Sequence, residues 1–289
     1  MKYAIEIDKY SGFCFGVTRA ISATESFLNK SEKIYCLGNI VHNNKEQERL
    51  KLIGLETIDY EKIDKIKNQN LIIRAHGEAP EIYKHLEANN INIIDETCPV
   101  VLKLQEKIKK IYSENPNSCI LIFGKKKHPE VNGLLGQTNN TATIISSFDE
   151  VKNIKINFPF YLFAQTTANY DEYLKIQEYL KNFIKNDDSK KYFFDTICPS
   201  VKKRIPQLQE FCKKHDIIIF VSDYNSSNGK MLFEICKKAN PNSYFVTSEL
   251  DINQEWFKGL YSIGISGATS TPVWLMKKIE EKIKKIFFF

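Results

Sequence analysis

The stretch INIIDETCPVVLKLQEKIKKIY, residues 91–112, contains the unit from which the fold is built. A short apolar run at 91–95 is typical of a strand, and Cys98 and a proline follow it. Apolar residues then recur every three or four positions, which predicts a helix over 102–112. A strand followed by a helix is half of a βαβ unit, the element from which parallel sheets are made.

The same order continues on both sides of this stretch. We expect further strands at 3–7, 33–37, 71–75, 118–124, 160–165, 192–195, 217–222 and 261–266, and helices that include 17–28, 170–183 and 233–238. Strands that alternate with helices indicate parallel sheets covered by helices. The predicted fold class is therefore α/β.

Two other segments resemble ETCPVV at 96–101, namely GFCFGV at 12–17 and TICPSV at 196–201. In each, a cysteine follows a strand or an extended segment, and a helix begins just after it. This pattern predicts three similar domains with mainly parallel sheets in a pseudo-threefold arrangement around a central cluster site. The predicted domains are 15–98, 99–194 and 195–289, and the N-terminal strand 1–14 joins the third.

Composition and charge limit the classes of function. The 289 residues are 43% hydrophobic and 26% charged, which is typical of a folded chain. Lys and Arg number 41 against 35 Asp and Glu, but the excess lysine is scattered, so no nucleic-acid partner is indicated. The first residues lack the pattern of an export signal, and no apolar run approaches the roughly 18 residues of a membrane span. We expect a cytoplasmic protein with no membrane partner.

Seven cysteines in a reducing compartment need an explanation other than disulfides. Four lie inside apolar strands or helices and are expected to be small buried hydrophobic residues: Cys36, Cys119, Cys212 and Cys236. Cys14, Cys98 and Cys198 lie at strand-to-helix junctions, where unpaired N–H groups favour a thiolate. Three converging thiolates would hold a metal centre with one position left open. Zinc with a histidine as the fourth ligand fits the same residues.

Polar residues also follow the predicted strands. His42, His76 and His128 each come after an apolar run, which predicts a shared anion site. Glu130 follows His128 beyond a proline that predicts an extended turn, and a carboxylate beside an anion has a raised pKa suited to an acid. Three hydroxyl-rich turns, 165–167, 226–228 and 267–272, could cap helices or together bind a diphosphate.

With these motifs in place, the chain resembles the LytB family of 4-hydroxy-3-methylbut-2-enyl diphosphate reductases. The resemblance runs from end to end and depends on an ordered set of motifs: GFCFGV, IVHN, AHG, TCP, HPEVNGLLGQT, QTT, NSSN and STP. Three departures stand out: CPSVKKRIPQ after the third cysteine, SGATSTP near the end, and the residues after NSSN from Gly229 onward. They leave the roles of Ser200 and Thr269 unassigned.

The resemblance implies three α/β domains around a [4Fe-4S] cluster, which Cys14, Cys98 and Cys198 bind and in which one iron stays open to the substrate. It implies that Glu130 donates a proton and that Thr166 orients the substrate hydroxyl. It further implies that an allylic diphosphate is held by His42, His76, His128, Ser226, Ser227, Asn228 and Ser270. Two-electron reductive dehydroxylation would then yield isopentenyl and dimethylallyl diphosphates, with ferredoxin or flavodoxin as the electron donor.

Two other functions stay open from the residues themselves. A quinolinate synthase-like dehydratase also uses three related domains and a three-cysteine cluster, although the HPE and NSSN turns argue against it. A zinc-stabilised protein that binds a small molecule without catalysis would use the same cysteines.

Overall fold

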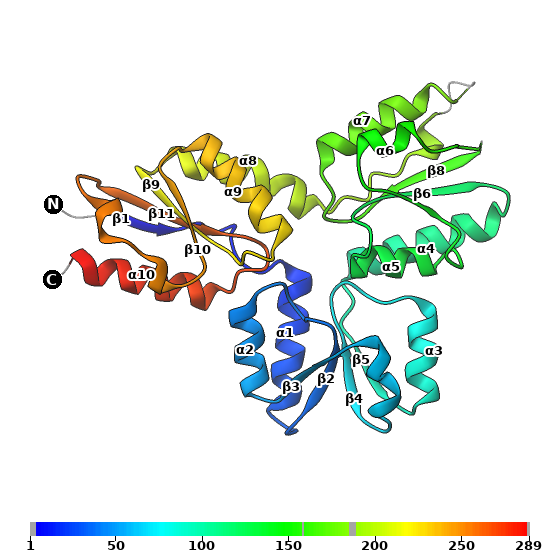
Figure 1. Cartoon of the computed structure of the whole chain (residues 1–289), viewed down its shortest axis with the longest axis horizontal. Helices are drawn as coiled ribbons and strands as arrows, with labels where there is room; N and C mark the ends of the chain where they lie inside the picture. The colour runs from blue at the N-terminus through cyan, green and yellow to red at the C-terminus, as the bar shows by residue number, and fades with distance from the viewer. Residues whose placement is uncertain (1–3, 158, 185–188, 288–289) are drawn as a thin grey trace. The chain divides into compact units, whose positions relative to one another are not determined.

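The computed structural model describes residues 4–157, 159–184 and 189–287, and it confirms the α/β fold class (Figure 1). Three small sheets with parallel pairing form within the described residues. The chain forms two compact units, one made of Met1–Glu25, Asn39–Leu55 and Lys203–Phe289, the other of Ser26–Gly38 and Glu56–Lys202. The domain boundaries expected from the sequence stay a prediction.

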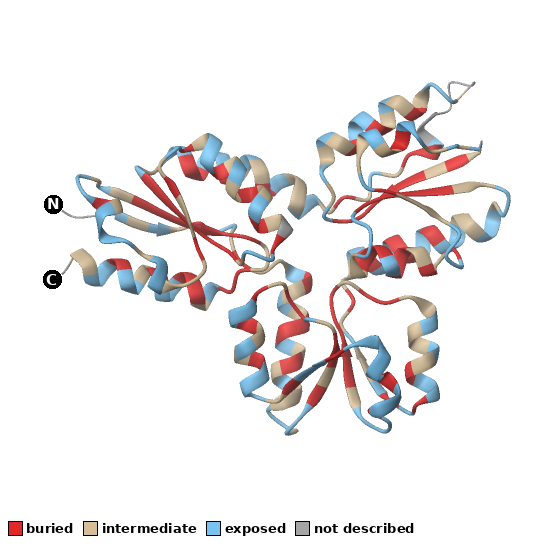
Figure 2. Ribbon diagram, viewed as in Figure 1, coloured by how far each residue is buried: buried red, intermediate tan, exposed pale blue. Residues whose placement is uncertain are grey.

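The sheet of the first unit has the strand order β1-β11-β9-β10. Its strands are β1 (Ala4–Ile7), β9 (Ile217–Val221), β10 (Ser243–Val246) and β11 (Ser262–Gly267). β11 pairs in parallel with both β1 and β9, so the N-terminal strand joins a sheet made by the last third of the chain. All five residues of β9 are buried, as expected for a central strand covered on both faces (Figure 2).

Helices cover both faces of this sheet. α8 (Pro199–Lys213) and α9 (Ser227–Ala239) pack their apolar residues on one face, and α10 (Val273–Phe287) packs on the other. The unit also contains α2 (Asn44–Leu52), two short 3-10 helices, Glu249–Asp251 and Gln254–Phe257, and the first part of α1 (Phe15–Leu28). Because β9 and β11 are parallel neighbours, their carboxyl ends lie side by side at one end of the sheet.

The second unit contains the other two sheets. One has the order β3-β2-β4-β5, from β2 (Ile34–Leu37), β3 (Leu55–Ile58), β4 (Asn70–Ile73) and β5 (Asn92–Asp95). The other has the order β7-β6-β8, from β6 (Cys119–Phe123), β7 (Thr143–Ile145) and β8 (Phe160–Ala164). Both have parallel register where neighbouring strands pair.

The β6 sheet is covered on both faces. α4 (Pro99–Glu114) and α5 (Pro129–Gly136) pack on one face, and α6 (Phe148–Lys152) and α7 (Tyr170–Lys181) on the other. α3 (Pro80–Ala88) and the 3-10 helix Tyr60–Lys65 pack against β4. The loops after β6 and β8 follow buried strands, and the loop after β5 follows an edge strand; all three lie at carboxyl ends of strands, where parallel sheets hold ligands.

Eight of the nine expected strands are present, and the one at 192–195 is wrong. Tyr192 ends the 3-10 helix Ser189–Tyr192, and Phe193 makes only an isolated bridge to Leu162. Both aromatic residues are buried in the core beside β8, so this segment is apolar because it packs against a sheet and not because it belongs to one. β3, β7 and β10 are short strands that the sequence did not indicate.

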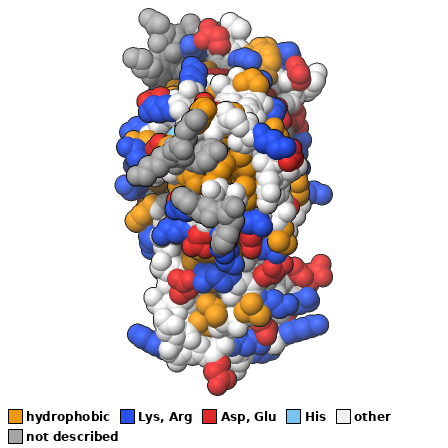
Figure 3. All heavy atoms as spheres, turned by 90° about the vertical axis from the view of Figure 1, so that its left-hand side faces the viewer, with side chains coloured by type: hydrophobic (Ala, Val, Ile, Leu, Met, Phe, Trp, Pro, Cys, Tyr) orange, Lys and Arg blue, Asp and Glu red, His pale blue; other side chains and the backbone are white. Residues whose placement is uncertain are grey.

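The composition bears on two further properties, the surface charge and the length of the helices. On the face drawn in Figure 3, Lys and Arg side chains are interspersed with Asp and Glu side chains. Within the described ranges, each helix is too short or too polar to cross a lipid bilayer.

Candidate functional site

Cys98 and Cys198 belong to the second unit, and each lies immediately before the first residue of a helix. Cys98 precedes α4 and Cys198 precedes α8, and proline occupies the first helical position in each case. Proline is favoured there because that position needs no N–H partner. Both cysteines are partly exposed, and the carbonyl oxygen of each accepts a bond from the first turn of its helix. The neighbouring N–H groups therefore surround each sulfur with partial positive charge.

The backbone of each of these cysteines is also tied to a second loop. The Cys98 N–H donates to the Ala75 carbonyl at 3.1 Å, directly before His76. The Cys198 N–H donates to the Thr166 carbonyl at 2.9 Å. The backbone of each cysteine is thus fixed next to a residue expected to contact the substrate, His76 or Thr166.

Glu130 and Thr166 form a buried pair. Their exposed fractions are 2% and 6%, and the two Glu130 carboxylate oxygens accept from the Thr166 N–H at 2.6 Å and from its hydroxyl at 2.9 Å. Burial raises the pKa of Glu130 to about 7, although both bonds from Thr166 oppose that rise. The sequence predicted a raised pKa from a nearby anion, but here burial is the cause. The carboxyl group can therefore hold or release a proton near neutral pH.

The segment around Glu130 is helical and not the extended turn that Pro129 suggested. Pro129 is the first residue of α5, and His128 is its N-cap. The His128 Nδ1 accepts from the Glu130 N–H at 3.2 Å, so the proton of the neutral ring is on Nε2. Since this bond orients the imidazole, the helix start fixes the histidine and the glutamate together.

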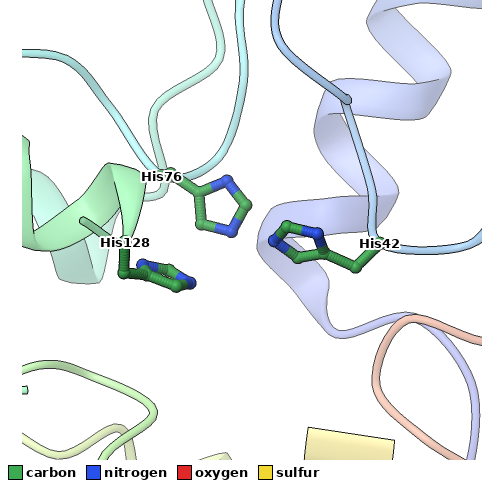
Figure 4. Close-up of side chains that lie close together, drawn as sticks. All are labelled: His42, His76 and His128. Carbon is green, nitrogen blue, oxygen red and sulfur yellow. The ribbon is translucent and has the colours of Figure 1, made fainter. Parts of the chain in front are cut away.

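His76 and His128 come together within the second unit. Their ring centroids are 5.1 Å apart and the rings meet edge to face at 85° (Figure 4). His42, which the same figure draws, belongs to the first unit, where it lies in the loop before α2. Two imidazoles this close offer adjacent N–H donors to an anion.

A buried charge cluster next to His76 was missed in the sequence. Glu78 and Arg74 are 2% and 4% exposed, and a Glu78 carboxylate oxygen lies 3.9 Å from the Arg74 NH2. The Tyr60 hydroxyl donates to both Glu78 oxygens at 2.8 and 3.0 Å. Burial raises the pKa of Glu78 to about 7, against the opposing effects of Arg74 and Tyr60. Opposite charges four residues apart in RAHGE, directly after an apolar strand, were the available signal.

The hydroxyl-rich turns of the first unit meet at the carboxyl ends of β9 and β11. Ser226 is the N-cap of α9, and its Oγ lies 3.2 Å from the Ser270 Oγ. The Asn228 side-chain amide donates to the Thr269 hydroxyl at 2.9 Å. The structure thus brings three predicted substrate contacts together, and it gives Thr269 a partner. Ser227 begins α9, but its side chain lies outside the described part.

His42 and Cys14 are the remaining predicted residues of the first unit. His42 lies directly before Asn43, the N-cap of α2, and the next N–H, from Asn44, donates to Asp223 at 2.9 Å in the loop after β9. Cys14 directly precedes α1, and its carbonyl accepts from the Thr18 N–H at 2.9 Å. All three predicted metal ligands therefore precede a helix.

The other four cysteines lie inside strands and helices, as expected. Cys36, Cys212 and Cys236 are fully buried, and Cys119 in β6 is half-buried. Burial raises the pKa of Cys36 to about 12 and that of Cys119 in the same direction. Burial therefore disfavours the metal-binding thiolate form of Cys36 and Cys119.

The fold is that of an α/β enzyme, and in each unit thiol, imidazole and hydroxyl side chains lie in loops that lead into helices; the second unit also contains the buried acid Glu130. The family described as LytB protein matches residues 5–284, and this chain belongs to that family. The resemblance inferred from the motifs is thereby confirmed.

Relatives and solved structures agree with this assignment. The chain is 49% identical to "4-hydroxy-3-methylbut-2-enyl diphosphate reductase" of Bacteroides fragilis, with 97% of each chain covered. It is 45% identical to the protein of that name from Porphyromonas gingivalis, with 98% and 99% covered. A solved (E)-4-hydroxy-3-methyl-but-2-enyl diphosphate reductase superposes with a TM-score of 0.75 at 30% identity, covering 98% of this chain and 99% of that one. A Plasmodium falciparum reductase superposes at 0.83 and 27% identity, covering 97% and 88%.

Proposed function

We propose that this chain reduces 4-hydroxy-3-methylbut-2-enyl diphosphate to isopentenyl and dimethylallyl diphosphates. The reaction consumes two electrons and two protons, breaks the allylic C–O bond and releases water. Relatives with this name cover nearly the whole chain. The observation that carries the proposal is the Glu130–Thr166 pair, because a carboxyl with a pKa of about 7 can protonate a leaving hydroxyl at neutral pH.

The cysteines at helix starts suit an iron–sulfur cluster. Thiolates are the usual cluster ligands, and N–H groups of a helix start stabilise negative charge on sulfur. Cys14, Cys98 and Cys198 would hold a [4Fe-4S] cluster with one iron free of protein ligands. When bound, the cluster supplies electrons and a Lewis acid. Ferredoxin or flavodoxin would deliver the electrons.

The remaining residues bind and protonate the substrate. His42, His76 and His128 donate N–H groups to the diphosphate, and Ser226, Ser227, Asn228 and Ser270 add donors from the two turns of the first unit. Thr166 orients the substrate hydroxyl while Glu130 delivers its proton. Since the allylic skeleton accepts the second proton at either of two carbons, two products form.

The test uses anaerobically purified protein with a strong reductant and the diphosphate substrate. We expect brown protein with iron and sulfide in equal amounts, and both five-carbon products by mass spectrometry. Quinolinate formation without these products would favour the dehydratase instead. Colourless protein with zinc and no iron would favour the non-enzymatic binding protein.

A further inference from the structure

We infer that Arg204 is a positioning residue that fixes the Cys14 loop against the turn carrying Ser270. The inference rests on the proposed function, since Cys14 and Ser270 have their roles there. It concerns a residue to which neither the motifs nor the relatives assign a role. All residues involved lie in the first unit.

Arg204 is buried between three segments. It is 3% exposed and projects from α8, and its NH1 lies 2.7 Å from an oxygen of Asp8, at the end of β1, which is 2% exposed. Its NH2 donates to the Ser266 hydroxyl at 2.8 Å and to the Gly267 carbonyl at 3.2 Å, at the end of β11. The Ser266 hydroxyl in turn donates to Asp8 at 2.9 Å, which closes the network.

From Asp8 the chain turns directly toward Cys14. The second Asp8 oxygen accepts from the Tyr10 N–H at 3.0 Å, and the Asp8 carbonyl accepts from the Ser11 N–H at 2.9 Å. Gly12 follows with φ +98°, and a side chain there would lie 3.2 Å from Val273 at the start of α10. The position of Cys14 is therefore set by the turn that Asp8 begins.

From Gly267 the chain turns toward Ser270. The Thr271 hydroxyl donates to the Val221 carbonyl at 2.7 Å and accepts from the Ala268 N–H at 3.1 Å, which closes the turn. Ser270 lies inside that closed turn, with its hydroxyl 3.2 Å from Ser226. Arg204 donates to the Gly267 carbonyl, where this turn begins, and pairs with Asp8, where the turn toward Cys14 begins. One guanidinium therefore fixes the first residue of both turns.

The arrangement is better explained by geometry than by stability. A buried ion pair adds little free energy of folding compared with apolar packing, but its hydrogen bonds can fix the register of the segments that it joins. The guanidinium reaches the carboxylate through one nitrogen and the hydroxyl and carbonyl through another, whereas lysine has a single nitrogen at the end of its stem. Lysine at this position should therefore keep the Asp8 contact and lose the contacts at the end of β11.

The test compares Arg204→Lys and Arg204→Met in the full chain. Peptide-level hydrogen exchange is measured over 9–14 and 267–272, Cys14 alkylation by iodoacetamide is followed in the metal-free protein, and KM and kcat are measured after cluster loading. We expect Arg204→Met to speed exchange in both segments, to speed Cys14 alkylation and to raise KM roughly tenfold or more. Arg204→Lys should speed exchange over 267–272 only, raising KM with kcat nearly unchanged.

Ile283→Val is the matched control, because Ile283 is a fully buried residue of α10 in the same unit and its apolar side chain makes no hydrogen bond in the Arg204 network. It should lower stability with unchanged exchange in both segments and unchanged KM. Unaltered exchange and alkylation in Arg204→Met would overturn the inference. If Arg204→Met does not fold, the lysine variant decides by whether exchange over 267–272 rises. A wild type without iron or turnover would refute the proposed function, while exchange and alkylation would still decide the role of Arg204.

Discussion

Replacing Glu130 with glutamine separates proton delivery from every other property of the site. Glutamine has the same shape and keeps one oxygen to accept the Thr166 N–H, which lies 2.6 Å from the carboxylate. The Thr166 hydroxyl can rotate to accept from the new amide. We expect cluster content and substrate affinity to stay close to wild type while turnover falls by about 10² to 10⁴, the usual contribution of a general acid. That range corresponds to about 3–5 kcal/mol of barrier.

The same variant should be more stable than wild type at alkaline pH. Burial raises the Glu130 pKa from its ordinary value of 4.5 to about 7 in the folded protein. Between these two values the folded state binds more protons than the unfolded state, so wild-type stability falls as pH rises from 4.5 to 7 and then levels off. The full loss is about 3 kcal/mol. Glutamine carries no charge and escapes this loss.

Urea unfolding of the metal-free proteins at several pH values measures this difference. The stability gap between Glu130→Gln and wild type should widen by about 2–3 kcal/mol between pH 5 and pH 8. Wild-type turnover should fall above about pH 7 as the acid loses its proton, whereas the residual turnover of the variant should lack that pH dependence.

Glu78→Gln is the matched control for both measurements. Glu78 lies in the same unit, is equally buried, and has its pKa raised to about 7 by the same cause. It should show the same widening of stability with pH and retain most of its turnover. The reasoning fails if Glu130→Gln turns over within about fivefold of wild type, or if Glu78→Gln loses as much activity as Glu130→Gln.

Three other experiments test the Thr166 pairing, the sorting of the cysteines and the packing at Gly229. Thr166→Val removes a hydroxyl that lowers the Glu130 pKa, so the alkaline limb of the pH–rate profile should move to higher pH; a shift to lower pH contradicts the pairing. Cys98→Ala should abolish iron and sulfide binding, whereas Cys36→Ala, at a fully buried thiol, should keep both. Iron and sulfide analysis measures this difference, and equal losses in the two variants would show that the cysteines were wrongly sorted. Gly229→Ala would place a Cβ 2.0 Å from the Ser222 Oγ and should destabilise the chain by about 1–3 kcal/mol. Denaturant unfolding should show partial recovery when Ser222→Gly is added, and additive losses in the double variant would argue against a clash.

The sequence was enough to propose candidate site residues along the chain. Parallel sheets place ligand groups after strands, so an apolar run followed by cysteine, histidine or serine marks such a position without any knowledge of the tertiary fold. Cys98 after β5 and Ser226 after β9 follow this rule. The sequence did not indicate the short strands β3, β7 and β10: β7 has only three residues and β3 (LETI) is half polar, so neither contains the apolar run by which the other strands were found.

Contacts between distant segments could not be predicted in this way. The Asp8–Arg204 pair joins two strongly polar residues whose burial appears only once β1 has added to β11. The pKa of Glu130 likewise depends on how completely α5 and the loop after β8 cover it, which no local pattern encodes. Local sequence therefore indicates candidate residues, whereas packing decides their protonation state.

The backbone bonds of the cysteines suggest how such a site keeps its geometry. Cys98 donates its N–H to the residue before His76, and Cys198 donates to Thr166 itself, so in each case the loop that bears a thiol is bonded to a loop that bears a proposed substrate contact. These bonds use the main chain and would survive replacement of either thiol by serine or alanine. Loss of function in such variants would then report missing ligands and not a collapsed loop, because the same N–H groups still hold the substrate-binding segments in place.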